Sequence, residues 1–189
     1  MRITAVDESR RIFLIEDIFS TSTVNKILSL DWPNLPWKRG NAQEKWQRRQ
    51  IDCTVDSSLQ QAVNEIWNLT EEIGKLCDVT FDNPHPATWW WHDEPGFDVS
   101  IHTDGHLPST MQIFWIAPSE YYATTFYKFK DENTPITEFK FIPNTGYIML
   151  NMPNKDGSQP LQWHGMLNTV PKNSFRVTSY TTFGPYKYK

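Results

Sequence analysis

The part of the chain that most restricts its fold begins after Asp78, where the composition changes. From there on, short runs rich in Thr, Val, Ile and aromatic residues alternate with Pro, Gly, Asn and Asp, as is typical of strands joined by turns. Eight runs are predicted as strands: 87–92, 97–103, 110–116, 123–129, 137–142, 146–150, 161–166 and 174–183. Eight short strands after two helices predict a double-stranded β-helix, the jelly-roll or cupin-like barrel.

The first third of the chain is predicted to be helical. Hydroxyls at 20–22 can cap a short helix, which should end at Trp32-Pro33 because a residue before proline avoids the helical region. A longer helix is predicted to start around 57–58, where apolar residues begin to recur at helical spacing. We therefore expect a mainly β fold with its N-terminal helices packed on one sheet. The 189 residues should form one domain, with 1–78 as helical support and 79–184 as the jelly-roll core.

Composition narrows the classes of function. The net charge is −4, and no long run of Lys or Arg suggests a phosphate-backbone footprint, so a nucleic-acid binder is not favoured. Lys45, Arg48 and Arg49 cluster, but three charges are typical of a solvated face. Cys53 and Cys77 are too few and too far apart for a disulfide framework or a CxxC metal site. With no signal-like start and no apolar run long enough for a bilayer, we expect a soluble cytoplasmic protein without a membrane partner.

The motif with the most chemical content is His102-Thr103-Asp104. On a strand, side chains two residues apart point to the same face, so His102 and Asp104 should project together. An imidazole and a carboxylate on one face provide two of the three ligands of a facial triad, which leaves positions open on a non-haem iron. Alone the motif is weak, because a strand end that runs into a glycine turn often carries a surface Asp and a stray His.

His164, on the expected penultimate strand, is the candidate third ligand. Among the other histidines, His85 lies in a predicted loop and His92 in a polar turn. His106 is spaced from His102 as in zinc sites on helices, but the neighbouring glycine and proline make a helix implausible there. The alternative for His164 is a buried, hydrogen-bonded core histidine.

Downstream of His164, strand alternation places Arg176 and Thr178 on one face and their apolar neighbours on the other. An arginine in such surroundings is costly to bury unless an anion pairs with it. Its guanidinium can bind a carboxylate through two hydrogen bonds, and the hydroxyl two residues on can donate another. The alternative is an internal salt bridge, for instance to Asp98 or Glu120.

The order of these residues resembles that of the 2-oxoglutarate/Fe(II)-dependent oxygenases, in particular the prolyl 4-hydroxylase-like members. That family has H-x-D, a distal His, and then Arg or Lys, often with Ser or Thr at the next-but-one position. The resemblance covers roughly 79–184, with weaker similarity at 95–97, at 123–126 and in the opening segment 12–20. One departure is that prolyl hydroxylases usually have Lys where Arg176 stands.

The resemblance implies an Fe(II)- and 2-oxoglutarate-dependent dioxygenase with His102, Asp104 and His164 as its catalytic metal ligands. It implies that Arg176 and Thr178 bind the distal carboxylate of 2-oxoglutarate. Consumption of O2 and 2-oxoglutarate would release succinate and CO2 while a peptide side chain or a small metabolite is hydroxylated.

Further candidates come from the same resemblance. Trp91, in the run 89–91, stands near where relatives often carry a cosubstrate-binding Tyr, although an ordinary core role is an equal alternative. Gln112 could face the cosubstrate from the strand after the H-x-D. Position 182 is Thr, where nucleic-acid-demethylating relatives have a second Arg, which disfavours base repair. The remaining alternatives are a cupin-like metalloprotein without 2-oxoglutarate and a non-catalytic jelly-roll binding module; the oligomeric state is not predicted.

Overall fold

The computed structural model describes residues 1–38, 47–130 and 135–189, and its main element is a seven-stranded sheet. The strand pairs of this sheet are all antiparallel. In order across the sheet, the strands are β1 (Arg2–Asp7), β2 (Ile12–Glu16), β9 (Thr145–Leu150), β6 (Ser109–Ile116), β11 (Arg176–Thr182), β5 (Ala87–Asp93) and β3 (Arg48–Ile51).

Two smaller sheets and two α-helices complete the described chain. A three-stranded sheet has the order β10-β7-β8, and a two-stranded sheet pairs β12 with β4. These strands are β10 (Trp163–Gly165), β7 (Thr125–Tyr127), β8 (Pro135–Glu138), β12 (Tyr186–Tyr188) and β4 (Val79–Phe81). The helices are α1 (Thr21–Leu28) and α2 (Ser57–Leu76), with short 3-10 turns at Trp32–Asn34, Cys53–Val55 and Glu120–Tyr122.

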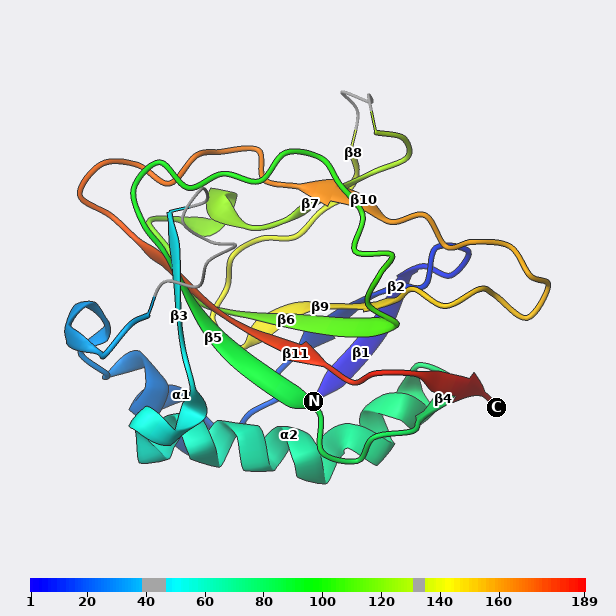
Figure 1. The fold of residues 1–189 in the computed structure, drawn as a ribbon, viewed down its shortest axis with the longest axis horizontal. Helices are drawn as coiled ribbons and strands as arrows, with labels where there is room; N and C mark the ends of the chain where they lie inside the picture. Colours follow the sequence, from blue (N-terminus) through cyan, green and yellow to red (C-terminus); the bar gives the residue numbers. More distant parts are fainter. Residues whose placement is uncertain (39–46, 131–134) are drawn as a thin grey trace.

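Both faces of the large sheet are covered. Figure 1 shows α2 lying across one face, while the small sheet β10-β7-β8 lies over the other. On the helix side, Ile66 of α2 belongs to one buried cluster with Trp90 and Trp115, whose ring centroids lie 5.4 Å apart. On the other side, Phe114 of β6 and Phe126 of β7 belong to a second buried cluster. The first cluster packs α2 against the large sheet, and the second packs the small sheet against its other face.

The two predicted helices are confirmed, and side chains cap both. The Ser20 hydroxyl accepts a hydrogen bond from the Thr23 amide at 3.2 Å, which satisfies one of the free N–H groups at the start of α1. α2 begins at Ser57, as predicted, and its cap is the Asp56 carboxylate, which accepts from the Ser58 amide at 2.7 Å.

Four of the predicted strands are also confirmed. The runs 87–92, 110–116, 146–150 and 174–183 correspond to β5, β6, β9 and β11. Three predicted strands are realised only in part. The runs 123–129 and 161–166 contain the shorter β7 and β10, and 137–142 overlaps only the end of β8.

The predicted strand 97–103 is wrong. Gly96 has a φ of 87°, a left-handed conformation that glycine adopts without steric cost, and its amide bonds to the Val170 carbonyl. The segment that follows is irregular, with one isolated bridge between His102 and His164. The chain here lies beside β10 through scattered hydrogen bonds and not through a continuous ladder.

Residues 1–78, expected as helical support, also contribute β1, β2 and β3 to the large sheet. β1 is an edge strand with much of its surface exposed, so it has little hydrophobic periodicity to detect. β3 has the sequence Arg-Arg-Gln-Ile, which does not read as a buried strand, although Arg48 is buried there. Within the described residues, none of the helices is long and apolar enough to cross a membrane.

Candidate active site

His102 and His164 are brought together by their backbones. The His102 amide donates to the His164 carbonyl, and the His164 amide donates to the His102 carbonyl, both at 2.9 Å. This mutual pair sets the two ring centroids 4.3 Å apart. Gly165 permits the approach, because a Cβ at that position would lie 2.8 Å from the Val99 carbonyl oxygen. The isolated bridge therefore fixes the position of His102 at the site, although the predicted strand 97–103 is absent.

Asp104 completes a group of three possible metal ligands. One ligand atom from each of His102, Asp104 and His164 lies within 4.8 Å of the other two. The Asp104 Oδ1 atom is 3.5 Å from Nε2 of His102, and its Oδ2 atom is 3.8 Å from Nε2 of His164. The three predicted ligands are therefore adjacent in space, although His164 lies far along the chain from the other two.

Hydrogen bonds fix which nitrogen of each ring faces Asp104. Nδ1 of His102 lies 2.8 Å from the Ser100 carbonyl, and Nδ1 of His164 lies 2.9 Å from the Gln162 carbonyl. Because a carbonyl oxygen only accepts, each neutral ring carries its proton on Nδ1 and presents the Nε2 lone pair. Two lone pairs and a carboxylate then converge on one point, as the ligands of a metal ion do.

The charge states of Asp104 and His164 suit a cation. Burial opposes ionisation of Asp104, but the hydrogen bond with His102, the positive charge that His164 carries in acid and the hydrogen bond from Tyr180 together lower its pKa to about 2. Burial lowers the pKa of His164 below its ordinary value, so at neutral pH this ring is uncharged. The group presents a carboxylate beside an imidazole that is free to bind metal.

Tyr180 orients the carboxylate. Its phenol donates to Oδ2 of Asp104 at 2.9 Å, and its ring stacks on Trp91 at a centroid distance of 4.3 Å. Burial raises the pKa of this phenol, so it remains protonated and acts as a donor. Tyr180 was not among the predicted site residues. The signal was present, because alternation along β11 places it on the same face as Arg176 and Thr178.

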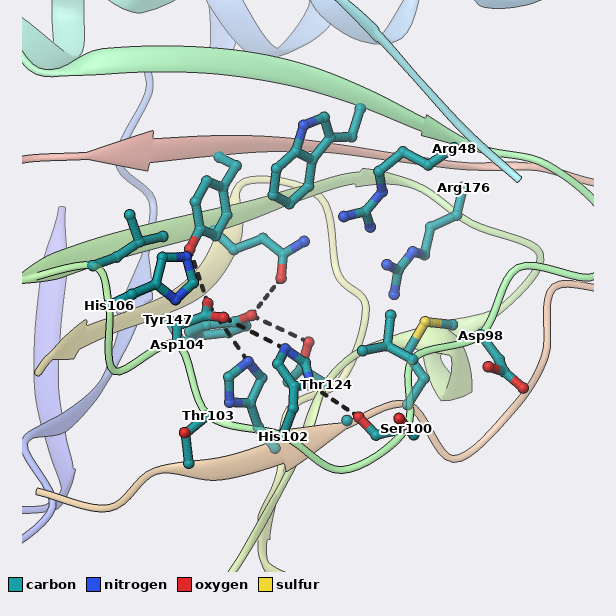
Figure 2. A pocket seen from close by; sticks show the side chains of 18 residues that line it. Arg48, Asp98, Ser100, His102, Thr103, Asp104, His106, Thr124, Tyr147 and Arg176 are labelled. Atoms are coloured by element: carbon teal, nitrogen blue, oxygen red, sulfur yellow. Dashed lines mark hydrogen bonds and ion pairs between the residues drawn. The ribbon is translucent and has the colours of Figure 1, made fainter. Parts of the chain in front are cut away.

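A cavity of about 510 Å3 extends from this group. Figure 2 shows Arg48 and Arg176 across the cavity from His102 and Asp104. The exposed lining residues Asp98, Ser100 and His106 mark its mouth. The buried polar lining residues are Arg48, Gln112, Thr124, Tyr147, His164, Arg176 and Tyr180.

The far end of the cavity is a charged network. Arg176, only 2% exposed, donates from Nε and Nη2 to Oδ2 of Asp93, both at 2.7 Å, and from Nη1 to the Tyr122 carbonyl at 2.9 Å. Arg48 donates from Nε to the other oxygen of Asp93 at 2.5 Å and from Nη2 to Oδ2 at 3.1 Å. An internal salt bridge of Arg176 is therefore present, with Asp93 and not with Asp98 or Glu120.

Strand pairing explains this network. Asp93 of β5 is directly opposite Arg176 of β11 on one side and Arg48 of β3 on the other. Opposite charges on neighbouring strands attract at this spacing. Burial opposes the charged form of Asp93, yet the two guanidiniums bring its pKa below the ordinary 3.8. Two cations share one anion, so the network has one surplus positive charge at the cavity.

Other predicted residues fall in different places. Thr178 is fully buried, and its hydroxyl accepts from Nε2 of Gln112 at 3.1 Å. Gln112 lines the cavity and Thr178 does not, so Gln112 separates the Thr178 hydroxyl from the cavity. Gln112 also accepts from the Tyr147 hydroxyl at 2.5 Å and lines the cavity, as does Trp91. Thr182 is the last residue of β11 and does not line the cavity.

The other predicted histidines are dispersed. His85 is exposed beside Trp67, and His106 stands at the cavity mouth. The expectation for His92 was wrong, because it lies in β5 and not in a turn; its ring stacks on Phe175. Lys45, expected on a solvated face, lies outside the described residues.

Comparison with known proteins shows relatives in structure only. No protein-family model matches the chain, and no curated protein matches it significantly. A prolyl-4-hydroxylase from Pseudomonas putida has a TM-score of 0.63 at 10% identity, with 92% of each chain covered. HygX from Streptomyces hygroscopicus, with nickel, 2-oxoglutarate and hygromycin B bound, has a TM-score of 0.57 at 9% identity, with 92% of this chain and 82% of that one covered.

A prolyl hydroxylase from Trichoplax adhaerens, in complex with a peptide fragment of the hypoxia inducible factor, has a TM-score of 0.60 at 9% identity. The match covers 93% of this chain and 84% of that one. Identities this low are informative about the fold alone. The chain has the jelly-roll fold of the 2-oxoglutarate/Fe(II)-dependent oxygenases, and the fold expected from the resemblance is confirmed.

Proposed function

We propose that this protein is an Fe(II)- and 2-oxoglutarate-dependent dioxygenase that hydroxylates a peptide side chain or a small molecule and releases succinate and CO2. One observation carries the proposal: His102, Asp104 and His164 present three metal-ligand atoms to one point, at the edge of a cavity whose other end has surplus positive charge. The fold supports it, since the oxygenases named above have this architecture.

The donor set fits Fe(II). Two imidazole nitrogens and one carboxylate oxygen on one side of an ion leave other positions open, as non-haem iron oxygenases require. His102, Asp104 and His164 would hold the metal, and Arg176 would bind the distal carboxylate of 2-oxoglutarate. Iron bound there would supply the redox chemistry that couples O2 and the 2-oxoacid to oxidation of a C–H bond.

The residues of this chain have the task of positioning and shielding. The Ser100 and Gln162 carbonyls hold the imidazole protons on Nδ1, and Tyr180 holds the carboxylate. Trp91 and Tyr147 close the inner walls of the cavity, where a dry environment strengthens every electrostatic contact.

The test is an anaerobic titration with Fe(II) and then 2-oxoglutarate, followed by melting temperature and visible spectrum. We expect stepwise stabilisation, since ligands that bind the folded state raise its stability, and a new absorption band only after the second addition. His164→Ala should abolish both steps. His85→Ala, which removes an exposed histidine outside the cavity, should leave both intact.

Each of the other outcomes indicates a different class of protein. Stabilisation by metal without any response to 2-oxoglutarate would indicate a cupin-like metalloprotein. No response to either would indicate a binding module in which the histidines are incidental. Where both steps occur, succinate release against a panel of free amino acids and peptides identifies the class of substrate.

A further inference from the structure

Arg48 was expected on a solvated face, yet the structure places it in the wall of the cavity. The residue is only 7% exposed, and Figure 2 shows its guanidinium beside that of Arg176, directed into the same space. It comes from β3, the edge strand of the large sheet, through its register with Asp93.

The hydrogen bonds leave Arg48 with more free donors than Arg176. Each guanidinium has five N–H groups. All three nitrogens of Arg176 have a protein acceptor, in Asp93 or the Tyr122 carbonyl. Arg48 bonds to Asp93 through Nε and Nη2, and among the described residues its Nη1 has no hydrogen-bond acceptor. An unfilled pair of donors in the cavity wall is available to an acceptor from outside the protein.

Aromatic rings fix the orientation of this guanidinium. Its central carbon lies 4.0 Å from the ring centroid of Trp91 and 4.3 Å from that of Phe97. A guanidinium stacked on aromatic rings and tied to a carboxylate along one edge has little freedom to turn. The free donors of Arg48 are therefore held in place before any ligand arrives, which lowers the entropic cost of binding.

The balance of charges also indicates that Arg48 is available to bind an anion. Asp93 neutralises one arginine, so Arg176 paired with Asp93 alone would offer no net charge to an anion. Arg48 supplies the surplus positive charge, and a buried unpaired charge is costly until a counter-ion binds.

We propose that Arg48 is a second cosubstrate-binding residue, which forms with Arg176 a two-arginine site for the distal carboxylate of 2-oxoglutarate. The proposal rests on the proposed function above. It makes the site selective for a 2-oxoacid with a second carboxylate, and it assigns to β3 a part in cosubstrate recognition.

The test compares Arg48→Met with Arg49→Met in Fe(II)-loaded protein under anaerobic conditions. Arg49 is the next residue of β3, does not line this cavity, and pairs with Glu94. Each variant is titrated with 2-oxoglutarate and with oxalate, which chelates a metal through adjacent oxygens and has no distal carboxylate. Binding is read from the shift in melting temperature and, for 2-oxoglutarate, from the absorption band.

We expect Arg48→Met to weaken 2-oxoglutarate binding at least about tenfold, the equivalent of one lost charged hydrogen bond. Oxalate binding should stay within about twofold of wild type, and Arg49→Met should change neither. Arg48→Lys keeps the charge in a more conservative variant, and should bind 2-oxoglutarate more tightly than Arg48→Met.

Unchanged 2-oxoglutarate binding in Arg48→Met would overturn the inference and leave the proposed function standing. Equal weakening of oxalate and 2-oxoglutarate in both Arg48 variants would also overturn it, since the role would then be structural. Wild-type protein that binds Fe(II) but not 2-oxoglutarate would instead refute the proposed function, and the inference with it.

Discussion

The two ends of the cavity are built in opposite ways. The histidine end, His102, Asp104 and His164, is held by an irregular segment, one isolated backbone bridge and two carbonyls that orient the rings. The arginine end, Arg48, Asp93 and Arg176, consists of three residues in register on adjacent regular strands. At the histidine end, three possible ligand atoms lie within 4.8 Å of one another. At the arginine end, most hydrogen bonds are already made and one positive charge is left over.

The difference indicates where stability and function lie. Side chains of the arginine end form buried ion pairs with one another, so a change there should first lower the stability of the fold. Side chains of the histidine end are held by Tyr180 and by two backbone carbonyls and contain no buried ion pair between regular strands, so a change there should first affect metal binding. Substitutions at the two ends should therefore differ in whether they first lower stability or metal affinity.

Asp93→Asn should cause the largest loss of stability. It leaves two buried guanidiniums without a counter-charge, and removing one partner of a buried ion pair costs about 3–5 kcal/mol. Asp104→Asn keeps an acceptor for Tyr180, so in metal-free protein it should cost less than about 1.5 kcal/mol. Urea unfolding of both variants measures the difference. Equal losses would show that the two ends do not differ as described.

The penalty in Asp93→Asn should also depend on pH. The pKa of Asp93 in the folded protein is below its ordinary value of 3.8, so its ionised form stabilises the fold fully above that value. This contribution is lost as the pH falls below 3.8 and through the folded pKa. The stability gap between wild type and Asp93→Asn should therefore be constant between pH 5 and 7 and narrow towards pH 3. A gap that widens on acidification would contradict the charge assigned to Asp93.

Tyr180→Phe should lower metal affinity at the histidine end while changing stability little. The phenol holds one oxygen of Asp104, and loss of such a supporting hydrogen bond typically lowers metal affinity about 10–100-fold. Stability without metal should change much less than in Asp93→Asn. Anaerobic titration with Fe(II), or with Mn(II) as a stable substitute, measures the affinity. Wild-type affinity in this variant would show that Tyr180 does not support the ligand.

Among the changes at the arginine end, Thr178→Val should have the smallest effect on 2-oxoglutarate binding. It removes the acceptor of the Gln112 amide while keeping the shape of the side chain, which costs about 1–3 kcal/mol of stability. Because Gln112 covers the hydroxyl, 2-oxoglutarate affinity should fall less than in Arg48→Met or Arg176→Met. Isothermal titration of the three iron-loaded variants gives the order. A larger loss for Thr178→Val would restore the direct cosubstrate contact expected from the resemblance.

The sequence predicted the histidine end better than the arginine end, for a physical reason. His102 and Asp104 are two residues apart, and His164 is followed by Arg176 and Thr178, so the order of these residues and the family resemblance selected them. The predicted strand under the motif is absent, but side chains two residues apart still reach one point because His102 pairs with His164.

The arginine end depends on strand pairing, which local patterns do not encode. Arg176 was placed correctly in the cavity, but its partner Asp93 lies on β5 and drew no attention at the polar end of a Trp-rich run. Arg48 was grouped with Arg49 as solvated, because a four-residue strand that begins with two arginines shows no core periodicity. Only the register of β3 with β5 reveals that one of the two is buried.

The most direct test of the central claim is a crystal structure grown anaerobically with Fe(II) and 2-oxoglutarate. We expect one metal bound by Nε2 of His102, a carboxylate oxygen of Asp104 and Nε2 of His164, with the distal carboxylate of 2-oxoglutarate hydrogen-bonded to Arg176 and Arg48. A metal bound elsewhere, or a cosubstrate whose distal carboxylate lies away from both arginines, would contradict it.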